Sequence, residues 1–245
     1  MESSLQPACG RRGLRALVRP EKVAVSRLWV AGAVLLSVLV FALLGIPTPY
    51  SVLVPGDAVK IGDGARDRWL GITTVHARQA RVLHLLAASF DPNARIVRTV
   101  ALSGCPDDLT RSKQVATSVA LGWVREHSGA AASVKAEDLE VDSVFEGPSA
   151  GLMLALAVVD AAMPGQLRGT HRIAGSGRLA SDGRIEPVSA IELKVLAAER
   201  DGADIFLAPR ANAAEAFYAA TRLRVIPVDT FDDAMDALQS LGEPG

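Results

Sequence analysis

The stretch VDSVFEGPSAGLMLALAVVDAAM, residues 141–163, decides the fold of this 245-residue chain. Leu139–Phe145 predicts a strand, and an almost entirely apolar helix follows from Pro148 to about Met163. Pro148 suits the first turn of a helix, where its missing N–H costs no hydrogen bond. Because this helix has hardly any polar face, we expect other elements to cover it on nearly every side.

Short strands and helices alternate after this helix, which predicts an α/β (α+β) fold. Ser189 and Glu192 have the spacing of a capping box, so we expect a helix to begin there and to end near Gly202. The other expected elements are strands at Arg172–Ala174, Gly183–Val188, Ile205–Ala208 and Leu223–Val228, and helices at Ala211–Ala220 and Phe231–Leu241.

The region before the strand at Leu139 has weaker patterns. Pro55-Gly56 and Gly62-Asp63-Gly64 predict a short strand and turns over residues 51–66. The small residues Ser128–Ala132 are the best candidate for a boundary, so we divide the region at residue 130. The expected elements are strands at Leu70–His76 and Ile96–Leu102, and helices at Gln79–Ser89 and Leu109–Val124.

An uncharged run near the start, Leu28–Ile46, predicts a membrane anchor. Its length is close to the roughly 20 residues that cross the hydrocarbon core. A cleaved signal peptide and a buried core helix are the alternatives, but no clear cleavage site follows the run, and a core helix would normally have a polar face. By the positive-inside rule we expect the N-terminus to be cytoplasmic, because only two acidic residues, Glu2 and Glu21, precede the run. The basic residues before it are Arg11, Arg12, Arg15, Arg19, Lys22 and Arg27.

Composition narrows the possible functions. The formal net charge is −1, so nothing global indicates a nucleic-acid partner. The two cysteines, Cys9 and Cys105, do not have the spacing of a zinc site, and we expect no metal. Neither a Walker A loop nor a GxGxxG loop is present, so we expect no nucleotide or other cofactor.

Ser149 is the first candidate catalytic residue. It lies between Gly147 and Gly151, which let the backbone turn sharply and let a substrate approach closely. Free N–H groups of a first helical turn, together with the helix dipole, favour negative charge there, as an oxyanion hole requires. The alternative is that Ser149 only begins the helix.

Lys194 is the candidate base that a serine nucleophile requires. Helical spacing puts it on the same apolar face as Ile191, Val195 and Ala198. Burial on such a face lowers the pKa of a lysine and makes the neutral amine available, which an arginine cannot provide. The alternative is a surface lysine whose stem covers apolar neighbours.

An α/β-hydrolase is the competing catalytic interpretation, because its nucleophile elbow also has the form G-x-S-x-G. That fold needs an acid and then a histidine after the serine. Only His171 follows Ser149, and Asp160, inside the apolar helix, is the only aspartate between them. Fewer than about 100 residues remain, which is too short for the rest of that fold.

The motifs Gly147-Pro148-Ser149-Ala150-Gly151 and Pro187–Lys194 (PVSAIELK) resemble those of the proteolytic domain of Lon proteases. The resemblance implies a catalytic dyad of Ser149 and Lys194, with an acidic residue at the position of Glu146. Details such as Ser181-Asp-Gly-Arg-Ile look closest to the membrane-anchored Lon-like proteins of Gram-positive bacteria. Hexameric rings are also what the family implies, so a homo-oligomer is an expected partner.

Some positions depart from the family pattern. The family threonine that contacts the lysine aligns with Ala174, with Ser176 two residues on, and Ser189-Ala190 replaces a Gly-Gly pair. The PDZ domain of the anchored relatives does not fit between the predicted elements. The ATPase module of full Lon proteases is also missing from the pattern, so we expect proteolysis without ATP.

These observations predict a Lon-like fold with four segments: a basic cytoplasmic segment at 1–27, a transmembrane helix at 28–46, an extracytoplasmic N-terminal part at 47–130 and a peptidase core at 131–245. The expected function is that of an ATP-independent serine endopeptidase, single-pass in the cell membrane, that hydrolyses protein or peptide substrates outside the cytoplasm. The alternative is a catalytically silent Lon-fold protein that binds peptides or scaffolds a membrane complex.

Overall fold

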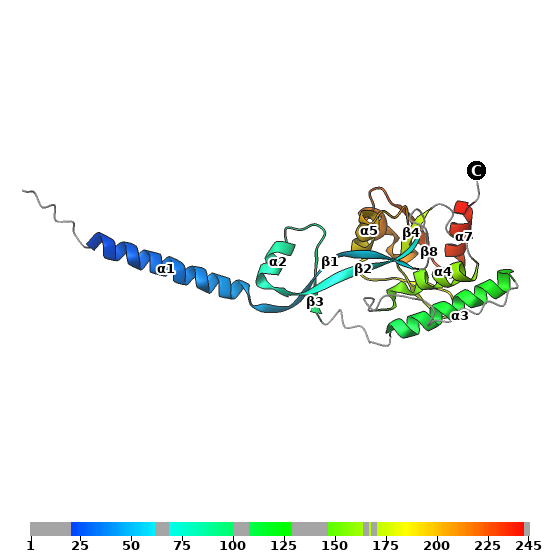
Figure 1. Cartoon of the computed structure of the whole chain (residues 1–245), viewed down its shortest axis with the longest axis horizontal. Coiled ribbons are helices and arrows are strands. Elements are labelled where there is room, and N and C mark those ends of the chain that lie inside the picture. Colours follow the sequence, from blue (N-terminus) through cyan, green and yellow to red (C-terminus); the bar gives the residue numbers. More distant parts are fainter. Residues whose placement is uncertain are drawn as a thin grey trace, which may run out of the picture. The chain divides into compact units, whose positions relative to one another are not determined.

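The computed structural model describes residues 21–61, 69–99, 108–128, 147–163, 167 and 171–242. It divides into two compact units, Met1–Ile46 and Pro47–Gly245. In the first unit, helix α1 spans Glu21–Leu44 (Figure 1). Its part Arg27–Leu44 has a mean hydropathy of 2.3 and none of it is buried, so α1 is long and apolar enough to cross a membrane.

The second unit contains a sheet in the order β3-β1-β2-β4-β7-β8 within the described part of the chain. Strands β1 and β2 form a long antiparallel hairpin, whereas β2, β4, β7 and β8 are parallel. A small antiparallel pair, β5 (Arg178–Leu179) and β6 (Ile185–Glu186), lies outside this sheet. The strands of the large sheet are β1 Pro47–Ile61, β2 Trp69–Arg81, β3 Arg95–Arg98, β4 Arg172–Gly175, β7 Ile205–Pro209 and β8 Arg224–Val228.

Helices cover both faces of the parallel part of the sheet. Neighbouring residues of a strand point to opposite faces, so each strand contributes to two separate cores. Ile173 belongs to the core shared with α3, α4 and α7, whereas Ala174 belongs to the core shared with α5 and α6. Ten consecutive residues of α4 are buried, as the sequence predicts. The helices are α2 Val82–Ala88, α3 Asp108–Ser128, α4 Gly151–Ala162, α5 Ile191–Arg200, α6 Ala213–Ala219 and α7 Phe231–Gly242, with short 3-10 turns η3 Pro148–Ala150 and η4 Arg210–Asn212. The α/β fold class is therefore confirmed.

The hairpin is the main difference from the sequence-based expectation. Residues 51–61 do not turn but continue as one strand, with a register shift between Pro55 and Ala58. Gln79 pairs with Ser51, so the expected helix at Gln79–Ser89 begins only at Val82. The pairing partner decides the conformation here, because β1 offers hydrogen bonds that local helix propensity does not outweigh.

The expected capping box at the start of α5 is wrong. The residue that precedes the helix is Ala190, which has the left-handed values φ 52° and ψ 41° and makes no side-chain cap. Glu192 instead accepts a hydrogen bond from Arg95 at 2.8 Å. Several other predictions lie outside the described residues: the Gly62–Gly64 turn, the end of the strand at Ile96–Leu102, the boundary at 130, the strand Leu139–Phe145, Glu146 and both cysteines.

Candidate active site

Ser149 lies in the 3-10 turn Pro148–Ala150, directly before α4. Gly147 precedes this turn with φ 121°, a value that side chains with a Cβ rarely adopt. The sharp approach to the helix therefore depends on glycine. The side chain of Ser149 is half-buried and that of Ala150 is buried.

Hydrogen bonds fasten the Ser149 turn to the segment that follows β4. The N–H of Gly177 donates to the carbonyl of Ser149 at 2.9 Å, and the N–H of Leu152 donates back to the carbonyl of Gly177 at 3.1 Å. The N–H of Ser176 donates to the carbonyl of Leu207 at 3.1 Å, which ties the same segment to β7. The sheet thus positions the start of α4 through two residues, Ser176 and Gly177.

Lys194 lies on the buried face of α5, with 6% of its surface exposed. Its Nζ donates to the Oγ of Ser176 at 2.9 Å, and that hydroxyl donates to the carbonyl of Ser149 at 3.1 Å. Within the described part of the chain, no hydrogen bond joins the side chains of Ser149 and Lys194. The structure therefore brings the two predicted residues to the same place, on either side of Ser176.

Burial lowers the pKa of Lys194 from 10.5 to about 8. The cause is desolvation, since the low-polarity surroundings disfavour the ammonium form. Ile191, Val195 and Ala198 from the same helix supply part of these surroundings, as the sequence predicts. A measurable fraction of neutral amine is consequently present near neutral pH.

Ala174, the residue aligned with the family threonine, is not the partner of the lysine in this structure. Ala174 is fully buried among the apolar side chains of α5 and α6, and Ser176 holds the lysine instead. Residues two apart on a strand share a face, so both residues face α5, and Ser176 is the one at the carboxyl end. The same strand face also carries Arg172, so no local pattern in the sequence marks Ser176 for this role.

His171 and Asp160, the residues that an α/β-hydrolase would need, are not near Ser149. His171 precedes β4 whereas Ser176 follows it, and five extended residues span about 16 Å. Asp160 is buried nine residues into α4, about 13 Å along the helix from its start. The structure therefore gives no support to the α/β-hydrolase interpretation.

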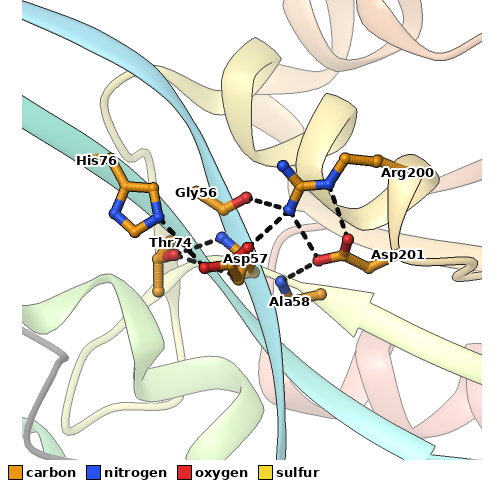
Figure 2. A network of polar contacts seen from close by, with 7 residues as sticks. All are labelled: Gly56, Asp57, Ala58, Thr74, His76, Arg200 and Asp201. Atoms are coloured by element: carbon orange, nitrogen blue, oxygen red, sulfur yellow. Dashed lines mark hydrogen bonds and ion pairs between the residues drawn. The ribbon is translucent and has the colours of Figure 1, made fainter.

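Both ends of α5 are fixed to the antiparallel part of the sheet. In its first turn Glu192 accepts from Arg95 of β3. At its last residue, Arg200 donates to the carbonyl of Gly56 at 2.7 Å and to the carboxylate of Asp57 at 2.8 Å (Figure 2). Asp201 completes the network by accepting from Arg200 and from the N–H of Ala58 at the irregularity in β1. These contacts hold Lys194 in its place between the two ends.

The site offers no cluster of metal ligands in the described ranges, where no group of three or more His, Cys, Asp and Glu residues is placed to hold an ion. The chemistry available there comes from a hydroxyl, a buried amine and the N–H groups of a helix start. Those are the groups of acyl transfer by a serine.

A family model supports this interpretation of the geometry. The Lon protease (S16) C-terminal proteolytic domain matches residues 96–239, which is more than half of the chain and includes Ser149, Ser176 and Lys194. The chain therefore belongs to the family of Lon proteolytic domains.

Three curated relatives are Lon proteases. Lon protease 1 of Myxococcus xanthus is 31% identical over 103 residues, which cover 40% of this chain and 12% of that protein. Lon protease of Roseiflexus castenholzii (strain DSM 13941 / HLO8) is 34% identical over 85 residues, or 35% of this chain and 10% of that protein. Lon protease of Chloroflexus aurantiacus (strain ATCC 29366 / DSM 635 / J-10-fl) is 33% identical over 94 residues, or 37% and 11%. The match thus spans only a small part of these relatives.

Proposed function

We propose that this protein is a membrane-anchored serine endopeptidase that uses Ser149 as nucleophile and Lys194 as general base. The observation that carries the proposal is the buried amine of Lys194, whose pKa is about 8 and which lies one hydroxyl away from the backbone of Ser149. The family, whose curated members here are named Lon proteases, supports a serine peptidase.

Proton transfer follows from the chemistry of a neutral amine. A neutral lysine keeps one lone pair while it donates an N–H to Ser176. Rotation of the Ser149 side chain brings its hydroxyl toward that lone pair. The amine takes the hydroxyl proton as the oxygen attacks the peptide carbonyl, and it then protonates the leaving amine. In the second half of the reaction the amine takes a proton from water as the water oxygen attacks the acyl-enzyme. The amine then returns this proton to the oxygen of Ser149 as the acid product leaves.

The start of α4 would stabilise the tetrahedral intermediate. Backbone N–H groups in a first helical turn point away from the helix toward its N-terminal end. Gly147 lets a substrate carbonyl approach this end closely, since no Cβ is in the way. Each such donor typically contributes about 10²–10³ to the rate.

The location and the energy requirement complete the proposal. In this proposal α1 anchors the chain, and the basic residues before its apolar part support an orientation with the N-terminus in the cytoplasm and the peptidase outside. No nucleotide motif is present in the sequence, so we propose hydrolysis without ATP. Flexible or unfolded chains are then the expected substrates.

A silent Lon-fold protein is the second candidate. The observation in its favour is that Lys194 is hydrogen-bonded to Ser176 and not to Ser149. In a silent protein that arrangement would be permanent, and the lysine would only stabilise the turn before α4.

The decisive experiment measures hydrolysis of a fluorescent unfolded protein by the full chain in lipid nanodiscs. We expect turnover in the natural protein, unchanged by ATP, and none in Ser149→Ala or Lys194→Arg. Arginine keeps its proton and cannot act as a base. Ser118→Ala and Lys60→Arg are matched controls at exposed positions and should keep full activity.

The pH profile separates a base from a merely positive group. Activity should rise with pH through about 8 as Lys194 loses its proton. Near-normal turnover in Lys194→Arg would reject the general-base role. Absence of hydrolysis across a broad set of unfolded proteins and peptides would favour the silent protein.

A further inference from the structure

Helix α2 has one exposed apolar face, which no described residue of the second unit covers. Leu83 is 51% exposed, Leu86 50% and Phe90 88%. They lie at helical positions i, i+3 and i+7, hence on one side of the helix and the turn that follows it. Ala88 on the opposite side is buried, and α2 packs against β1 and β2. Three large apolar side chains on one small helix form a surface that needs an occupant.

The position of α2, directly after the hairpin strand β2, indicates what covers this apolar face. Pro47, the first residue of β1, pairs with Arg81, and α2 begins at the next residue (Figure 1). The Oγ1 of Thr48 also donates to the carbonyl of Ala80 at 2.7 Å, which fixes this end of the hairpin.

The chain length from the anchor to this end is short. Only Gly45 and Ile46 separate α1 from β1. The three residues from Leu44 to Pro47 reach at most about 11 Å, and the cross-strand pair of Pro47 and Arg81 adds about 5 Å. The first residue of α2 follows Arg81 and adds about 4 Å, so the covalent chain limits it to at most about 20 Å from Leu44, within reach of the membrane surface.

The charges around α2 suit an anionic lipid surface. Residues 77–99 contain four arginines against a single acidic residue, Asp91. Three of the arginines, Arg78, Arg81 and Arg98, are exposed and take part in no ion pair among the described residues. Apolar side chains flanked by arginines are the composition of helices that lie in a membrane interface.

We propose that α2 is an interfacial helix that inserts Leu83, Leu86 and Phe90 into the outer surface of the membrane that α1 crosses. The proposal rests on the proposed anchor, because α1 brings this surface to the bilayer. With a second attachment close to the span, the hairpin is held against the membrane and does not rotate freely about the short connection.

The test uses the full chain in proteoliposomes of phosphatidylcholine and phosphatidylglycerol. A nitroxide label is attached to Leu86→Cys in a background of Cys9→Ser and Cys105→Ser, and its accessibility to oxygen and to a water-soluble nickel chelate is measured. Tyr218→Cys, at a position that is 92% exposed on α6, reports an aqueous site. Val34→Cys, inside the apolar span, reports whether α1 is in the bilayer.

We expect the ratio of oxygen to nickel accessibility at position 86 to be several-fold higher than at position 218 and closer to that at position 34. A ratio at 86 equal to that at 218, while 34 is in lipid, overturns the interfacial helix but leaves the anchor intact. An aqueous value at 34 overturns the anchor and with it this proposal. Spin–spin broadening at 86 that disappears on dilution with unlabelled protein would show that a second copy covers the face, which also overturns it.

Discussion

Replacing the buried lysine should make the protein more stable while it destroys the proposed activity. Lys194 is 6% exposed and its pKa is about 8, against 10.5 for an ordinary lysine. At about 1.4 kcal/mol for each tenfold change, the difference corresponds to about 3 kcal/mol that a charged Lys194 costs the folded state below pH 8. Lys194→Met keeps the length and apolar stem of the side chain without this cost.

The sign of the pH dependence follows from proton binding. Between pH 8 and 10.5 the unfolded chain keeps the lysine proton and the folded chain does not, so the stability of the natural protein rises with pH in that window. The advantage of Lys194→Met should therefore be about 3 kcal/mol at pH 7 and disappear toward pH 10.5.

Urea unfolding of the full chain in nanodiscs measures this difference. In a Trp29→Phe background the fluorescence comes from Trp69 and Trp123, both buried in the second unit. Arg111→Met, at an exposed position of α3, controls for the loss of one positive charge. An unchanged midpoint at pH 7, or an advantage that does not vary between pH 7 and 10.5, would refute the argument that Lys194 is desolvated in the folded protein.

Three further predictions concern the turn, the helix start and the topology. Ser176→Ala should lower turnover about tenfold and move the acidic limb of the pH profile to lower pH, because the hydroxyl that accepts from Lys194 is lost. Ser176→Thr should restore both the turnover and the profile, and an unchanged profile in Ser176→Ala contradicts this role. Ala190→Gly should raise stability by about 1 kcal/mol in the same urea assay, since φ 52° strains alanine, and a loss of stability would show that the left-handed conformation is not the one adopted. A reporter fused after Leu241 should be active only outside the cytoplasm, whereas activity inside would reverse the proposed orientation.

The parallel part of the fold could be predicted from the sequence because its signals are local. The apolar helix after Ser149 and the alternation from Arg172 onward depend on burial, which composition reveals directly. The length of the hairpin could not be predicted, since Gln79–Arg81 is extended only through its pairing with β1. Pairing between segments that are distant along the chain leaves no local pattern.

Two residues of the candidate site could be predicted from the sequence, and a third could not. Ser149 and Lys194 have local signatures, a glycine-flanked helix start and an apolar helical face. Ser176 acquires its role only when β4 and α5 pack together, so its spacing from Lys194 predicts nothing by itself. The Ser189–Glu192 spacing led to a wrong prediction because a residue distant in the sequence is involved. Arg95 of β3 donates a hydrogen bond to the carboxylate that a capping box would use.

The two proposed catalytic residues are held in place by different strands of the sheet. The Ser149 turn is fastened to the carboxyl end of β4 through Ser176 and Gly177. The lysine helix is fastened at both ends to β1 and β3, by Arg95 in one place and by the Arg200 network in the other (Figure 2). Strand β1 is also the element that begins two residues after the apolar span. The two supports also meet in the apolar core, where Ala174 of β4 packs with Ile191 and Val195 of α5, and β2 of the hairpin pairs directly with β4. The Lys194–Ser176 hydrogen bond therefore joins two parts that the sheet and the core already hold together. The distance from the amine to Ser149 is therefore set jointly by the hairpin, which holds α5, and by the end of β4, which holds the serine turn.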